Sequence, residues 1–123
     1  MNAIIKTSLI ASLIALLTLG LLASCARSPH PMNMTAAIQS AKTKADHEAL
    51  AEHYEETAEE MENKAVEHEA LLREYQREPW RFGKLATGFG NHCQNLIRIY
   101  RQAAEENREM AKMHRETAAG MKP

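Results

Sequence analysis

The chain is poor in the residues that interrupt helices. Its 123 residues include five Gly and four Pro, and none of these lies between Thr35 and Arg77. Ala, Glu, Lys, Leu, Met and Gln, which are strong helix formers, dominate that stretch instead. The sequence therefore predicts an all-α fold whose first long helix covers about residues 35–78. This helix is expected to end at Glu78, because the residue before a proline is pushed out of the α region.

The sequence also lacks the groupings on which common enzyme mechanisms depend. It has no paired acid and base for proton transfer and no phosphate-binding loop. His92 and Cys93 are neighbours, but adjacent residues on a helix point about 100° apart, so they do not form a base and nucleophile pair. The six histidines include no His–His pair at i, i+3 or i, i+4 and no Glu-x-x-His, the spacings that metal sites on helices use. We therefore expect a protein that is not an enzyme and holds no cofactor.

Charge and cysteine content restrict the partners further. Of the 15 Lys and Arg only Lys6 precedes Cys25, so the chain from Cys25 onward holds 14 cations against 16 Asp and Glu. That near balance argues against nucleic acid as a partner. Cys93 is the only other cysteine. In an oxidising compartment a lone cysteine is either buried and inert or paired between chains, so Cys93 is a candidate for an intermolecular disulfide.

The amino-terminal quarter has the pattern of a secretory signal. Residues 1–8 carry one cation, Lys6, and residues 9–22 are almost wholly apolar. This run is short for a membrane-spanning helix, which needs about 20 residues. A retained transmembrane anchor is the alternative interpretation.

The segment that follows, Leu22-Ala23-Ser24-Cys25, resembles the lipobox of bacterial lipoproteins at all four positions. The resemblance implies that residues 1–24 are removed, that Cys25 is linked to diacylglycerol through its nucleophilic sulfur, and that its new amino terminus is acylated. Several acyl chains together give stable attachment to a membrane. In such lipoproteins an Asp after the cysteine favours retention in the inner membrane. This chain has Ala26 there, so the resemblance implies the outer membrane, facing the periplasm, in an organism with two membranes.

Residues 25–34 are expected to form a tether between the lipid and the folded domain. Pro29 and Pro31 remove backbone donors and favour extended conformations, so this segment is a semi-stiff spacer. Beyond the lipobox, the helix-forming remainder of the chain resembles small helical lipoproteins of Gram-negative bacteria. That group has no established activity to carry over. The stretches that carry this resemblance are DHEALAEHYEETAEEMENKAVEHEALLREY and HCQNLIRIYRQAAEENREMAKMHRETA.

The thirteen residues from 79 to 91, PWRFGKLATGFGN, predict a connection, because they contain three Gly, one Pro and one Asn. Trp80 and Phe82 indicate an ordered loop that contacts a partner or lipid, or else caps the open end of the hairpin. Asn91, with Gln94 three residues later, predicts a capping box, and Gly120 predicts the residue after a helix end. The second helix is therefore expected at about 91–119, within one domain of residues 35–123.

Residues recur every seven positions in both predicted helices, as in a coiled-coil seam. The connection is too short for a parallel pair of such helices, so the sequence predicts an antiparallel hairpin in which His68 faces Tyr100 and His114 faces Tyr54. Residues 46–69 carry ten acids against one Lys, whereas residues 98–115 carry five cations against three Glu, and this asymmetry favours the same pairing. The series are Ala51, Ala58, Ala65 and Leu72; His47, Tyr54, Met61, His68 and Tyr75; and, in the second helix, Cys93, Tyr100, Asn107, His114 and Met121.

The seam contains few large apolar residues, and the two predicted helices differ in length. Residues 36–49 would overhang without a partner. Because a two-helix unit buries little apolar area, we expect the chain to self-associate as a homo-oligomer, in a four-helix arrangement.

The sequence is compatible with two functions. The first is a lipid-anchored scaffold or interaction protein of the envelope, which assembles with itself or with an envelope protein through features such as Trp80 and Phe82. The alternative is a periplasmic protein that binds Cu, Zn or Ni through His and Met side chains. The candidate ligands are His47, His68, His114, Met32 and Met34.

Overall fold

The computed structural model describes residues 31–122, and all regular secondary structure in this range is helical. The expected signal segment, the lipobox with Cys25 and most of the tether therefore lie outside the described residues. The elements in chain order are α2 (Met34–Ser40), α3 (Lys44–Arg77), the 3₁₀ turns η1 (Pro79–Arg81) and η2 (Gly83–Leu85), and α4 (Ala86–Gly120).

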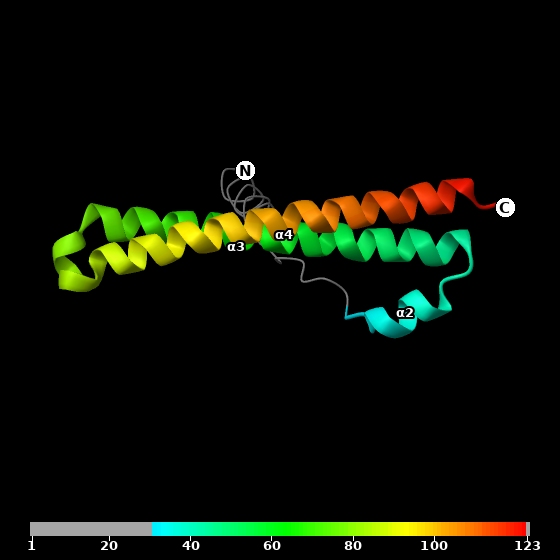
Figure 1. Ribbon diagram of the computed structural model, residues 1–123, viewed down its shortest axis with the longest axis horizontal. Coiled ribbons are helices and arrows are strands. Elements are labelled where there is room, and N and C mark those ends of the chain that lie inside the picture. The colour runs from blue at the N-terminus through cyan, green and yellow to red at the C-terminus, as the bar shows by residue number, and fades with distance from the viewer. Residues whose placement is uncertain (1–30, 123) are drawn as a thin grey trace, which may run out of the picture.

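The long helices α3 and α4 lie side by side over their whole length (Figure 1). Early residues of α3 contact late residues of α4, as in the ion pair between Glu55 and Arg115, whereas Glu69 pairs with Arg101. The two helices therefore run in opposite directions. The prediction of an all-α fold with two long helices packed against each other is confirmed.

Alanine makes up most of the core between these helices. On each helix three alanines at seven-residue intervals are at most 2 % exposed. Small side chains allow the two backbones to approach closely, so the helices pack over a narrow strip of contact. We call this strip the alanine seam; its members are Ala51, Ala58 and Ala65 of α3 and Ala104, Ala111 and Ala118 of α4.

Charged residues line one edge of the alanine seam, also at seven-residue intervals. Arg115 donates to Glu48 at 2.6 Å and to Glu55 at 2.7 and 2.8 Å, and Arg101 donates to Glu69 at 2.5 Å. The Arg115 guanidinium holds the pKa of the Glu55 carboxyl below its usual range. These side chains are partly exposed, so each pair contributes little by itself, but the set favours a single register of α3 on α4. We call the set the Arg–Glu ladder; it comprises Glu48, Glu55, Glu62 and Glu69 with Arg101, Arg108 and Arg115.

The prediction of one continuous helix over 35–78 is wrong, because the chain breaks between α2 and α3. Thr43 caps α3 by accepting a hydrogen bond from the Asp46 amide at 3.2 Å. The Asp46 carboxylate in turn accepts from the amides of Lys42 and Thr43 at 2.9 and 2.8 Å. This capping box stabilises a helix start inside a breaker-free stretch. It lowers the pKa of Asp46, chiefly through the Lys42 amide.

The predicted start of the second helix at Asn91 is also wrong. α4 begins at Ala86, and Gly88 and Gly90 lie within it. A Cβ at Gly90 would lie 3.6 Å from the Leu72 side chain, which is ordinary van der Waals contact, so this glycine faces α3. The reversal itself needs a glycine at Gly83, whose φ is +56°. Gly120 is the last residue of α4 rather than the residue after it.

The prediction that residues 36–49 overhang without a partner helix is wrong for the part of this range that belongs to α3. Because α4 starts early, the two long helices are matched at 34 and 35 residues, and His47 already contacts His114. Among the α-helices of residues 31–122, only α2 lies outside the pair. It folds back beside the end of the hairpin where α3 begins and packs against α3 (Figure 1).

Enlarging one seam alanine should destabilise the fold. Ala58 is 2 % exposed, so Ala58→Leu must separate the helices, and we expect a loss of about 1–3 kcal/mol in the free energy of unfolding. Urea denaturation followed by circular dichroism at helical wavelengths measures this loss. The matched control is Ala70→Leu on the exposed side of α3, which should leave stability nearly unchanged. Equal effects of the two substitutions would contradict the seam.

Candidate functional site

Histidine and tyrosine side chains gather along the edge of the alanine seam opposite the Arg–Glu ladder. The Nδ1 atoms of His47 and His114 lie 3.0 Å apart, and their rings stack with centroids separated by 5.3 Å. Tyr54 stacks on His114 as well, with centroids 5.6 Å apart and ring planes 12° from parallel. These three side chains form a partly buried cluster where α3 begins and α4 ends.

The contact between His47 and His114 requires particular protonation states. A hydrogen bond between two Nδ1 atoms needs one ring to donate and the other to accept, so at least one imidazole is neutral. Burial lowers the pKa of His114, and the proximity of His47 lowers it further. Burial at this position therefore favours the neutral form of His114.

His68 lies elsewhere in the hairpin. Its ring stacks on Tyr100 with centroids 5.6 Å apart, so both predicted His–Tyr pairings, with Tyr100 and with Tyr54, are confirmed as contacts. The pairs meet by ring stacking. Within residues 31–122, the buried Nδ1 atom of His68 has no hydrogen-bond partner.

The candidate metal ligands are only partly brought together. His47 and His114 meet, whereas His68 packs on Tyr100 farther along the hairpin. Met32 lines a small hollow with His53 on the other side of α3, and Met34 is the first residue of α2. Among the described residues, no three His, Cys, Asp or Glu side chains converge in a way that could hold a metal ion.

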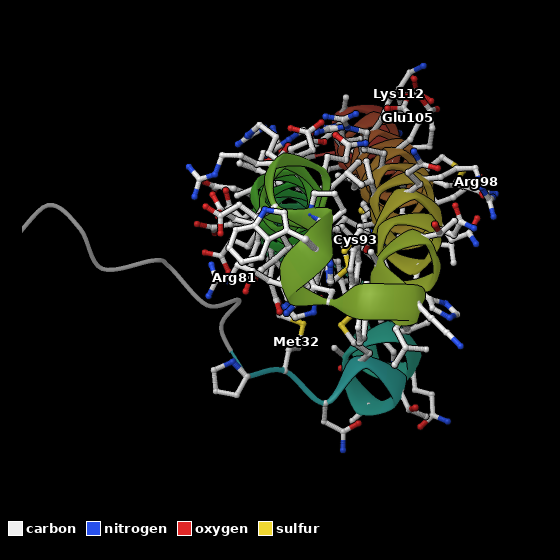
Figure 2. The ribbon with its side chains drawn as sticks, turned by 90° about the vertical axis from the view of Figure 1, so that its left-hand side faces the viewer. Met32, Arg81, Cys93, Arg98, Glu105 and Lys112 are labelled. Atoms are coloured by element: carbon white, nitrogen blue, oxygen red, sulfur yellow. The ribbon has the colours of Figure 1, made fainter. Side chains whose placement is uncertain are left out.

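Cys93 is buried in the interior of the hairpin, between α3 and α4 (Figure 2). Its side chain is 5 % exposed and is a free thiol. The intermolecular disulfide stays a prediction, and forming it would require Cys93 to leave the hairpin interior.

Trp80 and Phe82, the two aromatic residues predicted for an interface, have different environments at the turn that joins α3 and α4. Phe82 packs into a ring cluster, 4.7 Å from the Tyr75 centroid and 6.2 Å from that of Phe89. Trp80, by contrast, is 76 % exposed. Phe82 therefore holds the turn against the helices, while Trp80 is free to make contacts. Leu85, 64 % exposed, was not singled out by the sequence patterns, because a single leucine in a connection carries no periodic signal.

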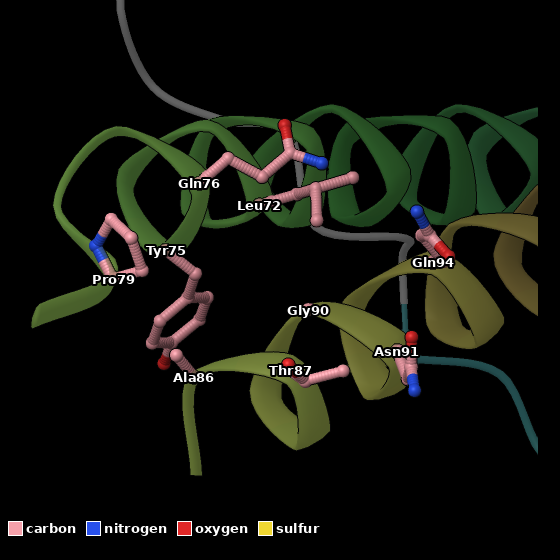
Figure 3. A pocket seen from close by; sticks show the side chains of 9 residues that line it. All are labelled: Leu72, Tyr75, Gln76, Pro79, Ala86, Thr87, Gly90, Asn91 and Gln94. Atoms are coloured by element: carbon pink, nitrogen blue, oxygen red, sulfur yellow. The ribbon is translucent and has the colours of Figure 1, made fainter. Parts of the chain in front are cut away.

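A hollow of about 240 Å³ lies between the last turns of α3 and the first turns of α4 (Figure 3). Leu72 and Tyr75 supply its apolar wall, and Gln76, Asn91 and Gln94 place amide groups around it. Gly90 leaves the space open, since it has no side chain to fill it. The hollow carries no charged group in its lining and is small for a ligand site.

The histidine cluster makes stability depend on pH. A folded-state pKa below the unfolded value means that the unfolded chain binds more protons, so stability is complete above the unfolded pKa of about 6.5 and declines as pH falls through it. Urea denaturation at pH values on both sides of about 6.5 should show this decline. His114→Gln should flatten that part of the profile, whereas His92→Gln, at an exposed position, should not. A parallel decline in His114→Gln would contradict the assignment.

No helix within residues 31–122 combines the length and apolar character needed to cross a membrane. Comparisons with protein-family models, with curated proteins and with solved structures found no match for this chain.

Proposed function

We propose that this protein is a lipid-anchored helical scaffold of the bacterial envelope, held through Cys25 at the outer membrane and facing the periplasm. The lipobox-like segment Leu22-Ala23-Ser24-Cys25 supports the anchor. In this proposal the antiparallel hairpin of α3 and α4 is the working part, and it acts by binding other helices rather than by chemistry.

A second apolar stripe on α4 is the observation that carries the proposal. Its residues are three, four or seven positions apart, which places them on one face of the helix, outside the alanine seam. Ile99 and Met113 are 47 % and 51 % exposed, and Phe89 is 40 % exposed. The stripe consists of Phe89, Leu96, Ile99, Ala103, Met110 and Met113.

This stripe supports self-association because α3 leaves its apolar side chains on α4 partly exposed. Alanine side chains bury little area, so the hairpin gains less from its core than helices packed through leucine do. Two copies that join their α4 stripes would form the four-helix arrangement and bury that surface. Apolar side chains that gather on one exposed face of a helix are typical of an interaction surface.

Introducing a charge into the stripe should break the assembly. In the purified full chain in detergent, Ile99→Glu is expected to shift the mass measured by light scattering from an oligomer to a monomer, because an unpaired carboxylate is costly to bury. Val66→Glu is the matched control, since Val66 is 50 % exposed on α3 outside the stripe. A monomeric unmodified chain, or an oligomer that survives Ile99→Glu, would contradict assembly through this stripe.

The anchor has its own test in cells. The unmodified chain should incorporate a clickable palmitate analogue and sediment with outer membranes, and Cys25→Ser should abolish the labelling, because serine lacks the nucleophilic sulfur. Cys93→Ser is the control, and it should retain the label. Labelling that persists in Cys25→Ser would exclude this cysteine as the attachment point.

The contact between His47 and His114 favours a second candidate function, the binding of a transition metal. Two imidazole nitrogens 3.0 Å apart are close to the separation of neighbouring ligands on one ion, because copper–nitrogen and nickel–nitrogen bonds of about 2 Å at right angles place them about 3 Å apart. Solvent or a second copy would complete the coordination. This candidate uses neutral histidine, the form that burial favours at His114.

Calorimetry with Cu(II) and Ni(II) tests this candidate on the full chain. Binding at one ion per chain, weakened at least about tenfold by His47→Gln or His114→Gln, would support it. His92→Gln supplies the control, because His92 is exposed and lies outside the cluster. Binding that is weak, or equal in all three variants, would assign the metal to scattered surface groups and exclude the site.

A further inference from the structure

The turn end of the hairpin, residues 79–85, exposes apolar side chains that nothing in the fold uses. Trp80 is 76 % and Leu85 is 64 % exposed, the two largest values among the exposed large hydrophobics of the described residues. Both belong to short 3₁₀ turns that are supported from behind by the ring of Phe82 packed on Tyr75. The exposed pair is therefore presented by an ordered turn.

Cations are the only charged residues in the stretch of sequence, from the turn into α4, that begins directly after Glu78. Residues 79–104 contain no Asp or Glu, although the whole chain has 16. At the turn Arg81 binds Glu78 at 2.8 Å and lies 6.0 Å over the Phe82 ring, whereas Lys84 forms no ion pair within residues 31–122. A cation without a carboxylate partner thus lies between the two exposed apolar residues in the sequence.

We propose that the turn end binds the surface of an anionic lipid bilayer. Trp80 and Leu85 would enter the interfacial region, where the amphipathic indole of tryptophan is favoured, and Lys84 and Arg81 would lie among the lipid phosphates. The turn closes the end of the rod and faces the viewer in Figure 2, so it meets another surface end-on. Exposed apolar side chains beside a cation without a carboxylate partner match the surface of an anionic bilayer, where phosphates lie above an apolar interior.

This contact goes beyond the proposed scaffold function and does not depend on lipid at Cys25. The turn end lies at the opposite end of α3 from Lys44 (Figure 1). The 34 residues of α3 span about 51 Å at 1.5 Å per residue. A chain anchored near its amino terminus would then touch lipid at two separate places.

The single tryptophan of the chain gives a direct measurement, because Trp80 is the only fluorescent indole. The full chain is reconstituted in neutral phosphatidylcholine vesicles, and vesicles that contain brominated phosphatidylcholine are added, with or without phosphatidylglycerol. Bromine quenches tryptophan only on contact within the bilayer. We expect a blue shift and quenching with the anionic vesicles, reduced by high salt because salt screens the attraction.

Variants that retain Trp80 identify the groups responsible. Lys84→Gln should weaken the partitioning to anionic vesicles about fivefold, as expected for one cation at such a surface. Leu85→Asn should weaken it about tenfold or more, because a leucine side chain is no longer transferred out of water. Val66→Asn, which changes an equally apolar residue on α3, should leave the quenching unchanged.

Three results would overturn the proposal. The first is the absence of quenching by anionic brominated vesicles. The second is equal quenching by neutral vesicles together with no effect of Lys84→Gln, which would remove the anionic preference. The third is a blue shift that appears before any brominated vesicle is added and grows with the number of protein chains per vesicle. That result would show that the turn end contacts a second copy of the chain. Failure at Cys25 is detected separately, by loss of palmitate labelling with the quenching intact.

Discussion

The close approach of two helices through alanine is the constraint on which the rest of this structure depends. Because the alanine seam is narrow, most larger side chains lie at its edges or on an outer face, and among the described residues only Leu50 and Cys93 join the alanines in the core. The Arg–Glu ladder occupies one edge, and the stacked histidines and tyrosines occupy the other. Both depend on the register that the seam permits, since a shift along the helices would separate Arg115 from Glu55.

This division also explains why the fold leaves surface for partners. Alanines bury little apolar area, so the hairpin has a small core for its length, and its largest apolar side chains remain outside that core. On α4 they form a stripe that could pack a second copy, and at the turn end Trp80 and Leu85 project into solvent. The proposed scaffold and lipid-contact roles therefore use residues that the seam excludes from the interior.

Sequence reasoning located the long helices but misjudged three of their ends. The break before α3 follows from Thr43 and Asp46, a threonine–aspartate capping box that is easily overlooked inside a run of helix formers. The first turns of α4 contain Gly88 and Gly90. Because glycine has a low helix propensity, these residues predict a loop instead of a helix. Packing of Tyr75, Phe82 and Phe89 across the turn offsets that propensity, and such long-range contacts leave no local signal.

The sequence by itself determined the helical class and the heptad spacing of the alanines, because both follow from a 3.6-residue period read along one chain. It also predicted the facing pairs His68–Tyr100 and Tyr54–His114, because an antiparallel reversal at the connection sets which residues lie opposite each other. It could not determine that His47 meets His114 at 3.0 Å, or that Phe82 is held against the helices while Trp80 is exposed. Those outcomes depend on the exact lengths of two helices and on how one turn closes between them. Tertiary packing decided them, since a change of a few residues at a helix end moves a side chain from the interior to solvent.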